Sequence, residues 1–69
     1  MGDRKVRNFA KRAEAIRQAN NAYALDCQML GRGNVIFDVD MKNRRCTITT
    51  PSMDGSKDVT HFVWEEEVW

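Results

Sequence analysis

The spacing of apolar residues changes at Gly31 to Gly33 and divides the chain into a helical part and a strand part. Before these glycines, a set of mostly apolar residues recurs at alternating steps of three and four. This spacing places them in one stripe along one side of an α-helix. The stripe consists of Val6, Phe9, Ala13, Ile16, Asn20, Tyr23, Cys27 and Leu30. We therefore expect a helix over about residues 3–30, with Asp3 as its N-cap and Gly31 as its stop.

After the glycines, apolar and polar residues alternate with the period of two that is typical of half-buried strands. We expect strands over about residues 34–41, 44–50 and 58–65, with a hairpin turn at Lys42-Asn43. Pro51 ends the second strand, and Asp54-Gly55 predicts the next turn. The hairpin places these residues opposite each other: Phe37 and Ile48, Val39 and Cys46, Asp40 and Arg45.

These elements predict one domain over residues 1–69 with an α+β fold. The long N-terminal helix packs on a three-stranded antiparallel sheet in the order αβββ, a meander, and gives two layers. Residues 65–69 form an acidic, aromatic tail. Alternation alone does not show which sheet face the helix covers, and the other face stays exposed.

The charges of the chain are unevenly distributed. Residues 1–20 hold six basic and two acidic side chains, whereas residues 21–69 hold five basic and eight acidic ones. Two cysteines without a Cys-x-x-Cys spacing, and a charged start without a signal-peptide pattern, favour a cytoplasmic location. No segment has the run of about 20 apolar residues that crosses a bilayer, so we expect no membrane association.

Arg4, Arg7 and Lys11 are expected to form a basic ridge on the outer side of the helix. Cations near a helix N-terminus oppose the helix dipole, so folding alone does not favour them there. The ridge is typical of contact with phosphate or with an acidic protein surface. The alternative is a solvated face that Glu14 and the acidic tail neutralise in part.

Two further groups predict a protein interface. Ala22, Leu25 and Met29 lie on the expected outer side of the helix, where a monomer is usually polar. The tail combines indoles, which are enriched at binding hot spots, with an acidic run; the residues are Trp64, Glu65, Glu66, Glu67 and Trp69. The alternatives are that the tail covers the helix, and that its glutamates guard an edge strand.

Metal and catalytic sites are not expected. Residues from Asp54 to Glu65 partly match a calcium-loop spacing, but Val59 occupies the position that requires glycine. Cys27, Cys46 and His61 lack the spacing of a zinc site. We therefore predict no catalytic residue, no metal and no cofactor.

The sequence favours a small, non-catalytic binding protein that regulates or inhibits a macromolecular partner by covering part of its surface. The expected partner is a protein or protein complex, as for many small inhibitors from phages and mobile elements. One alternative is a nucleic-acid-binding protein that uses Arg4, Arg7, Lys11 and Arg12. Another is a structural homodimer, because the helix stripe fits a heptad with Asn20 at a core position.

Overall fold

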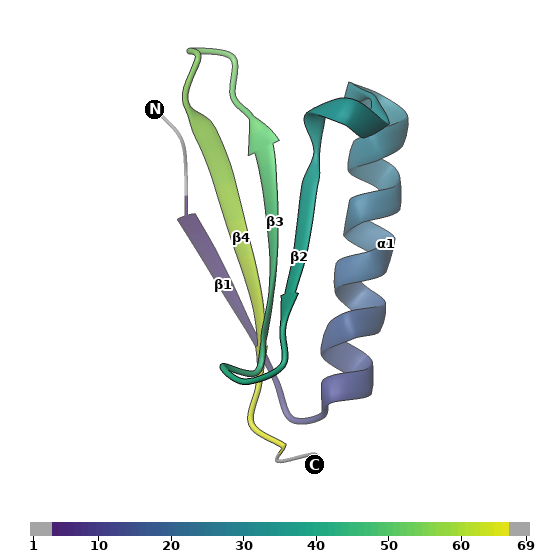
Figure 1. Ribbon diagram of the computed structural model, residues 1–69, viewed down its shortest axis with the longest axis vertical. Helices are drawn as coiled ribbons and strands as arrows, with labels where there is room; N and C mark the ends of the chain where they lie inside the picture. The colour runs from purple at the N-terminus through teal and green to yellow at the C-terminus, as the bar shows by residue number, and fades with distance from the viewer. Residues whose placement is uncertain (1–3, 67–69) are drawn as a thin grey trace.

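One helix lies along one side of a four-stranded sheet in the computed structural model, which describes residues 4–66 (Figure 1). The chain begins with strand β1 (Arg4–Phe9) and continues into helix α1 (Arg12–Leu30). A short 3-10 helix, η1 (Arg32–Asn34), leads into β2 (Ile36–Asp40), β3 (Arg45–Pro51) and β4 (Lys57–Trp64). The α+β class is confirmed, but the expected αβββ order is wrong because a strand precedes the helix.

The sheet is mixed and has the strand order β1-β4-β3-β2. β2, β3 and β4 form the expected antiparallel meander, and β1 joins β4 in parallel. A parallel neighbour needs a crossover connection, which here runs through α1, β2 and β3. The predicted three-stranded antiparallel sheet is therefore corrected to a mixed sheet of four strands.

Residues 4–9 form a strand in which Phe9 reaches the buried aromatic residues of β4. Phe9 lies opposite Trp64 in the ladder, and its ring stacks on Phe62 with the ring centroids 6.1 Å apart. The Arg7 guanidinium lies 5.7 Å from the centroid of each phenylalanine ring. These contacts stabilise β1 at the edge of the sheet, although five of its six residues are exposed.

The register of the β2–β3 hairpin is confirmed. Phe37 pairs with Ile48, and Asp40 pairs with Arg45. The turn differs in detail, since the positive φ of 55° falls on Arg44 and not on Asn43. The Asn43 backbone amide instead donates to Asp40 Oδ1 at 3.1 Å, and its side-chain amide donates to Asp40 Oδ2 at 2.7 Å. Asn43 thereby lowers the pKa of the Asp40 carboxyl.

The core lies between α1 and one face of the sheet. Phe62 and Trp64 on β4 are 1% and 4% exposed, so the side of the strand that carries them is buried. Packed on the buried core are partly buried residues from β1, α1 and β2, which include Phe9, Ile16 and Phe37. The buried core consists of Ala15, Ala19, Val35, Cys46, Ile48, Phe62 and Trp64.

The buried side of α1 is rotated relative to the expected stripe. Ala15 and Ala19 are fully buried, because alanine lets the helix backbone approach the sheet closely. Ile16, Tyr23 and Cys27 of the expected stripe do pack against the core. The remaining three helix positions of that stripe, Ala13, Asn20 and Leu30, are exposed, which contradicts their expected burial.

The two ends of α1 differ in their local stop signals. Lys11 stands at the N-cap in an extended conformation without a side-chain capping bond. The expected N-cap, Asp3, lies outside the described residues. Gly31 ends the helix as expected, with φ of 92°, and its N–H donates to the Cys27 carbonyl at 2.9 Å. Within residues 4–66, no helix has the length and apolar character needed to cross a membrane.

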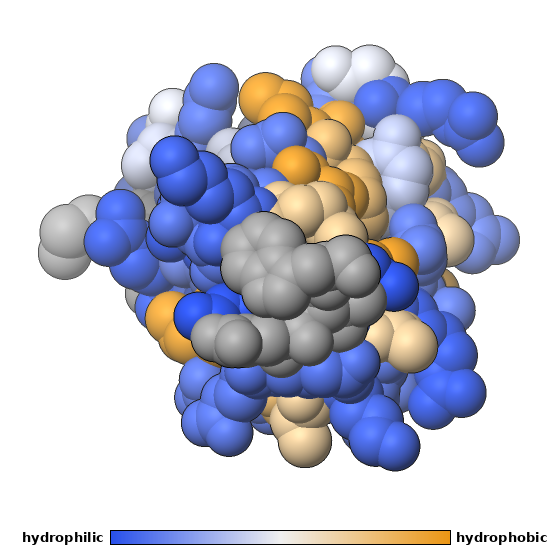
Figure 2. Space-filling view, turned by 60° about the horizontal axis from the view of Figure 1, so that its bottom comes forward, coloured by the Kyte–Doolittle hydropathy of each residue, from blue (hydrophilic) through white to orange (hydrophobic). Residues whose placement is uncertain are grey.

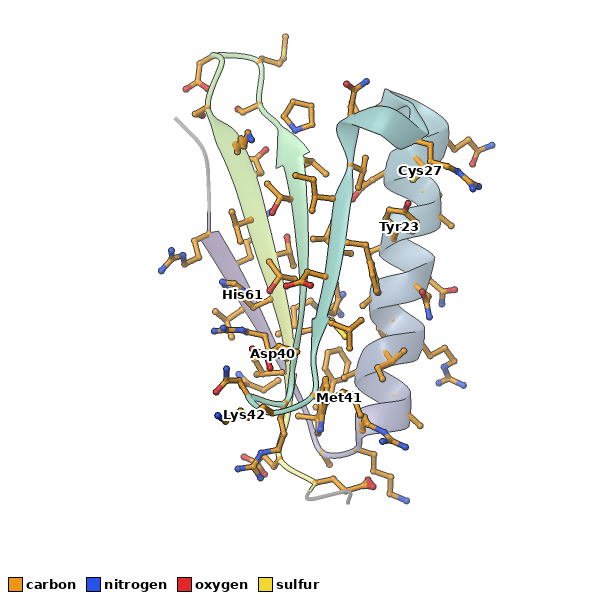
Figure 3. The ribbon with its side chains drawn as sticks, in the orientation of Figure 1. Tyr23, Cys27, Asp40, Met41, Lys42 and His61 are labelled. Carbon is orange, nitrogen blue, oxygen red and sulfur yellow. The ribbon has the colours of Figure 1, made fainter. Side chains whose placement is uncertain are left out.

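The second face of the sheet is not covered by α1. Alternation along β4 places His61 on this face, where Thr47 Oγ1 lies 3.0 Å from His61 Nδ1 (Figure 3). The register continues the same row to Val6 on β1 and to Asp38 on β2. Val6 is 54% exposed. Polar, charged and β-branched residues therefore share this open face.

Candidate functional site

The C-terminal half of α1 presents an uncharged surface to solvent. Between Gln18 and Gly31 the chain has a single charged residue, Asp26, and that residue is partly buried. The first part of the chain contrasts with this, because residues 4–17 contain seven charged residues. Depletion of charge in an exposed segment is typical of the central part of a protein interface. The uncharged helix surface comprises Asn20, Asn21, Ala24, Leu25, Gln28 and Met29.

Two long apolar side chains lie on the uncharged helix surface. Leu25 is 59% exposed and Met29 is 79% exposed, and they are one helical turn apart. Leu30 adds a third partly exposed apolar side chain at the helix end. This confirms the exposure that was expected for Leu25 and Met29. A flexible methionine beside a leucine fits irregular apolar surfaces on a partner.

A hollow of about 540 Å³ adjoins this surface on the side of α1 that faces β2. Its walls come from successive turns of α1 and from Arg32 of η1. Tyr23 and Cys27 lie one turn apart on the helix (Figure 3). The Tyr23 ring also meets the Phe37 ring edge-on, with the centroids 5.1 Å apart. Tyr23 thus joins the helix to β2 at the base of the hollow.

The Tyr23 hydroxyl and the Cys27 thiol interact within this hollow. The hydrogen bond between them is the main reason why the pKa of Tyr23 is raised above its ordinary value of 10. A tyrosine phenol is neutral near pH 7, and the raised pKa of Tyr23 keeps it so. A neutral hydroxyl beside a free thiol supplies polar groups without adding charge. Apart from Arg32 in its wall, the hollow consequently shares the uncharged character of the helix surface.

Two of the predicted interface residues are not accessible as expected. Ala22 packs against the core and is partly buried, because the helix is rotated relative to the expected stripe. Trp64 is only 4% exposed and lies under the helix. Trp64 is therefore a core residue, and Ala22 packs against the core with only part of its surface exposed, so neither is the exposed anchor that was predicted.

The expected basic ridge on the helix does not exist. Arg4 and Arg7 lie on β1, while Lys11 precedes the helix and Arg12 begins it. Alternation places Arg4 on the open sheet face and Arg7 on the helix side, above the phenylalanine rings. Arg4, Arg7 and Lys11 are all exposed. The cations therefore line a sheet edge and the turn that follows it.

The start of the acidic tail continues the sheet. The backbone N–H of Glu65 donates to the Phe9 carbonyl at 3.2 Å, and that of Glu66 donates to the Ala10 carbonyl at 3.1 Å. Glu65 is exposed and Glu66 is partly buried. The predicted contacts of Glu67 and Trp69 lie outside the described residues. The surface at this end of the molecule is largely hydrophilic, with apolar side chains in a band above the centre of the view and in smaller separate patches (Figure 2).

The three residues considered as zinc ligands are not brought together. Cys46 lies on the buried side of β3, and His61 lies on the opposite face of the sheet. Burial raises the pKa of the Cys46 thiol, with a further contribution from Asp38. Within residues 4–66, no three His, Cys, Asp or Glu side chains are grouped so that they could hold a metal ion.

Sequence reasoning identified Leu25 and Met29 but missed the wider surface around them. The absence of charge from Gln18 to Gly31, apart from Asp26, is visible in the sequence and was the available signal. The hollow beside Tyr23 had no comparable signal, because it depends on where β2 meets the helix.

Comparisons with protein families, curated proteins and solved structures give no match to this chain.

Proposed function

We propose that this chain is a small, non-catalytic binding protein that regulates or inhibits a protein partner by covering part of the partner's surface. The observation that carries this proposal is the uncharged helix surface, with Leu25 and Met29 exposed at its centre. In a chain with 30% charged residues, an uncharged stretch of this length on an exposed helix supports a contact role.

The chemistry of this surface supports a protein partner. Leu25 and Met29 supply apolar area, and the side-chain amides around them supply hydrogen bonds without the cost of burying a charge. Phosphate binding would require cations here, and the two that adjoin this surface lie at its ends: Arg17 one turn before Asn20, and Arg32 at the rim of the hollow. The uncharged helix surface therefore supports protein binding over nucleic-acid binding.

The test is capture of partners from a lysate of the encoding organism, with and without nuclease. Leu25→Asp and Met29→Asp should each weaken the captured complex by about tenfold or more, because each buries a charge at the centre of the contact. Ala13→Asp is the matched control, since Ala13 is exposed on the same helix but outside the uncharged helix surface. Circular dichroism should show that all three variants stay folded.

Three results would overturn the proposal. One is loss of the partner on nuclease treatment, which would mean that nucleic acid mediates the contact. Another is a complex that Leu25→Asp and Met29→Asp leave unchanged. The third is a wild-type chain that sediments as a dimer while Leu25→Asp sediments as a monomer, which would assign the surface to self-association.

A further inference from the structure

The outer edge of β1 is a second exposed surface, separate from the uncharged helix surface. β1 is the terminal strand of the sheet and has β4 on one side (Figure 1). An edge strand presents unpaired backbone N–H and C=O groups to solvent. On β1 this edge is accompanied by the exposed side chains of Arg4, Lys5, Val6, Arg7 and Asn8.

The hydrogen bonds to β4 show which backbone groups of β1 face outward. The Phe9 carbonyl accepts from the Glu65 N–H, so the backbone groups of Phe9 point toward β4. In a parallel ladder this direction alternates along the strand. The N–H and C=O groups of Arg4, Val6 and Asn8 therefore point away from the sheet, with Val6 at the centre.

The side chains give this edge a defined charge pattern. Lys5 and Arg7 project on the helix side. Arg7 is held over the rings of Phe9 and Phe62, and Lys5 lines a small hollow together with Asp26 and Asp58. A guanidinium that is already held in place loses little conformational entropy when it binds a carboxylate. On the open side, Val6 presents an apolar, β-branched side chain that is 54% exposed.

We propose that β1 accepts an extended acidic segment of a partner protein as an additional strand of the sheet. The recognised segment alternates acidic residues, which face Lys5 and Arg7, with β-branched apolar residues, which lie beside Val6. Backbone hydrogen bonds supply affinity in this mode, and the alternating side chains supply specificity. This inference rests on the proposed function in one respect: both take the partner to be a protein.

The charges oppose a second copy of β1 on this edge. Two such strands would bring their cations together, and like charges across a strand pair are destabilising. An acidic strand on this edge would instead place carboxylates beside the cations of β1, and that contact is attractive. The edge therefore disfavours pairing with itself while remaining attractive to the proposed segment.

Nucleic acid fits the neighbouring sheet face poorly. Binding of single strands on a sheet relies on aromatic side chains that stack on the bases. The open-face positions of the four described strands carry His61 as their one aromatic ring, so this face lacks the stacking platform that its cations, Arg4, Arg45 and Lys57, would need to hold a single strand. A phosphate backbone also has no N–H groups to donate to the outward carbonyls of β1. The acidic protein segment is therefore the occupant that the observations favour.

The probe is a capped, fluorescent peptide of about eight residues in which glutamate alternates with valine. The expected result is saturable binding in low salt, with amide shifts in β1 measured by NMR. The control peptide has the same sequence with N-methylated valines. It keeps the charge and loses the edge hydrogen bonds, so it should bind at least about tenfold more weakly.

Val6→Pro is the variant that separates edge pairing from charge attraction. The substitution removes an outward N–H and leaves the ladder to β4 intact. Proline is tolerated on an edge strand where the N–H points away from the neighbouring strand. We expect peptide affinity to fall by at least about tenfold. Val6→Thr keeps both the N–H and the β-branched shape and should bind as the wild type does.

Lys5→Glu tests the charge pattern, and Arg17→Glu is its control because it makes the same charge change on an exposed helix position. Lys5→Glu should lower affinity by about tenfold. Arg17→Glu should change it by less than about twofold.

The proposal is wrong if the wild type does not bind the peptide, or if Val6→Pro or Lys5→Glu binds it as the wild type does. It is also wrong if a single-stranded oligonucleotide binds with an affinity that Lys5→Glu lowers and Val6→Pro does not. Self-association that Val6→Pro abolishes would assign the edge to a second copy and overturn it as well. Leu25→Asp should bind the peptide normally, so a failure here is distinguishable from failure of the helix surface.

Discussion

Phe9 of β1 stacks on Phe62 of β4 with an angle of 19° between the ring planes. The two residues are far apart in sequence and meet because β1 runs parallel to β4. Phe62 is 1% exposed, so Phe9 covers one side of a ring at the centre of the core. This contact is the main apolar attachment of β1 to the rest of the sheet.

Phe9→Ala should therefore destabilise the protein and release β1. We expect a loss of about 2 kcal/mol in the free energy of unfolding, less than for a fully buried phenylalanine because Phe9 is partly exposed. Urea denaturation measures the loss, and hydrogen exchange should show faster exchange at β1 amides. Val6→Ala, on the open face of the same strand, should cost less than about 1 kcal/mol. Equal losses in the two variants would contradict this role for Phe9.

The sequence predicts a helix over the residues that form β1, because the contact between Phe9 and Phe62 leaves no trace in the local pattern. Val6 and Phe9 continue the spacing of Ala13 and Ile16, so a helical pattern extends through the strand. β1 also lacks a clear alternation, because charged residues lie on both of its faces. Its partner β4 is distant in sequence, and a parallel pairing of distant segments leaves no local signal.

The β2–β3 hairpin could be predicted because its information is local. Its strands alternate, a short turn joins them, and one register satisfies both Phe37 with Ile48 and Asp40 with Arg45. Gly31 was also predictable as the helix stop. For the candidate site, Leu25 and Met29 were found from periodicity, whereas Trp64 was misplaced because alternation did not show which face the helix covers.

The close approach of α1 to the sheet should make Ala19 intolerant of larger side chains. Ala19 is fully buried, so Ala19→Leu must displace core neighbours, at a cost of about 1–3 kcal/mol. Ala24→Leu is the matched control, because Ala24 is exposed on the same helix and the change in helix propensity is the same. Its effect should stay within about 0.5 kcal/mol. Thermal and urea denaturation compare the two variants, and an unaffected Ala19→Leu would show that the packing is loose.

The two glycines beside the end of α1 should respond differently to alanine. Gly31 has φ of 92°, and an added Cβ would lie 3.3 Å from Asn34 Nδ2. The Asn34 side chain donates to the Leu30 carbonyl at 2.6 Å, so moving it would disturb the bond at the helix end. Gly31→Ala should therefore cost about 1–3 kcal/mol.

Gly33→Ala is the control for this prediction. An added Cβ at Gly33 meets no atom within 4 Å, and no positive φ opposes the substitution. Its free energy of unfolding should stay within about 0.5 kcal/mol of the wild type. A Gly31→Ala variant as stable as Gly33→Ala would show that the helix end adapts without strain.

His61 should make the stability of the fold depend on pH. Burial against the sheet lowers the pKa of His61 below its ordinary value of 6.5, and Arg45 and Arg4 add to this effect. Because the folded-state pKa is below the unfolded one, the contribution is fully present above pH 6.5 and is lost as pH falls through the folded-state pKa. The melting temperature of the wild type should therefore fall with decreasing pH in this window, and His61→Gln should remove that part of the slope.

Asp40→Asn serves as the control for the His61 prediction. The pKa of the Asp40 carboxyl is lowered from its ordinary value of 3.8, so this group affects stability only in more acidic solution, below about pH 3.8. A wild-type slope that His61→Gln leaves unchanged would assign the pH dependence to other groups.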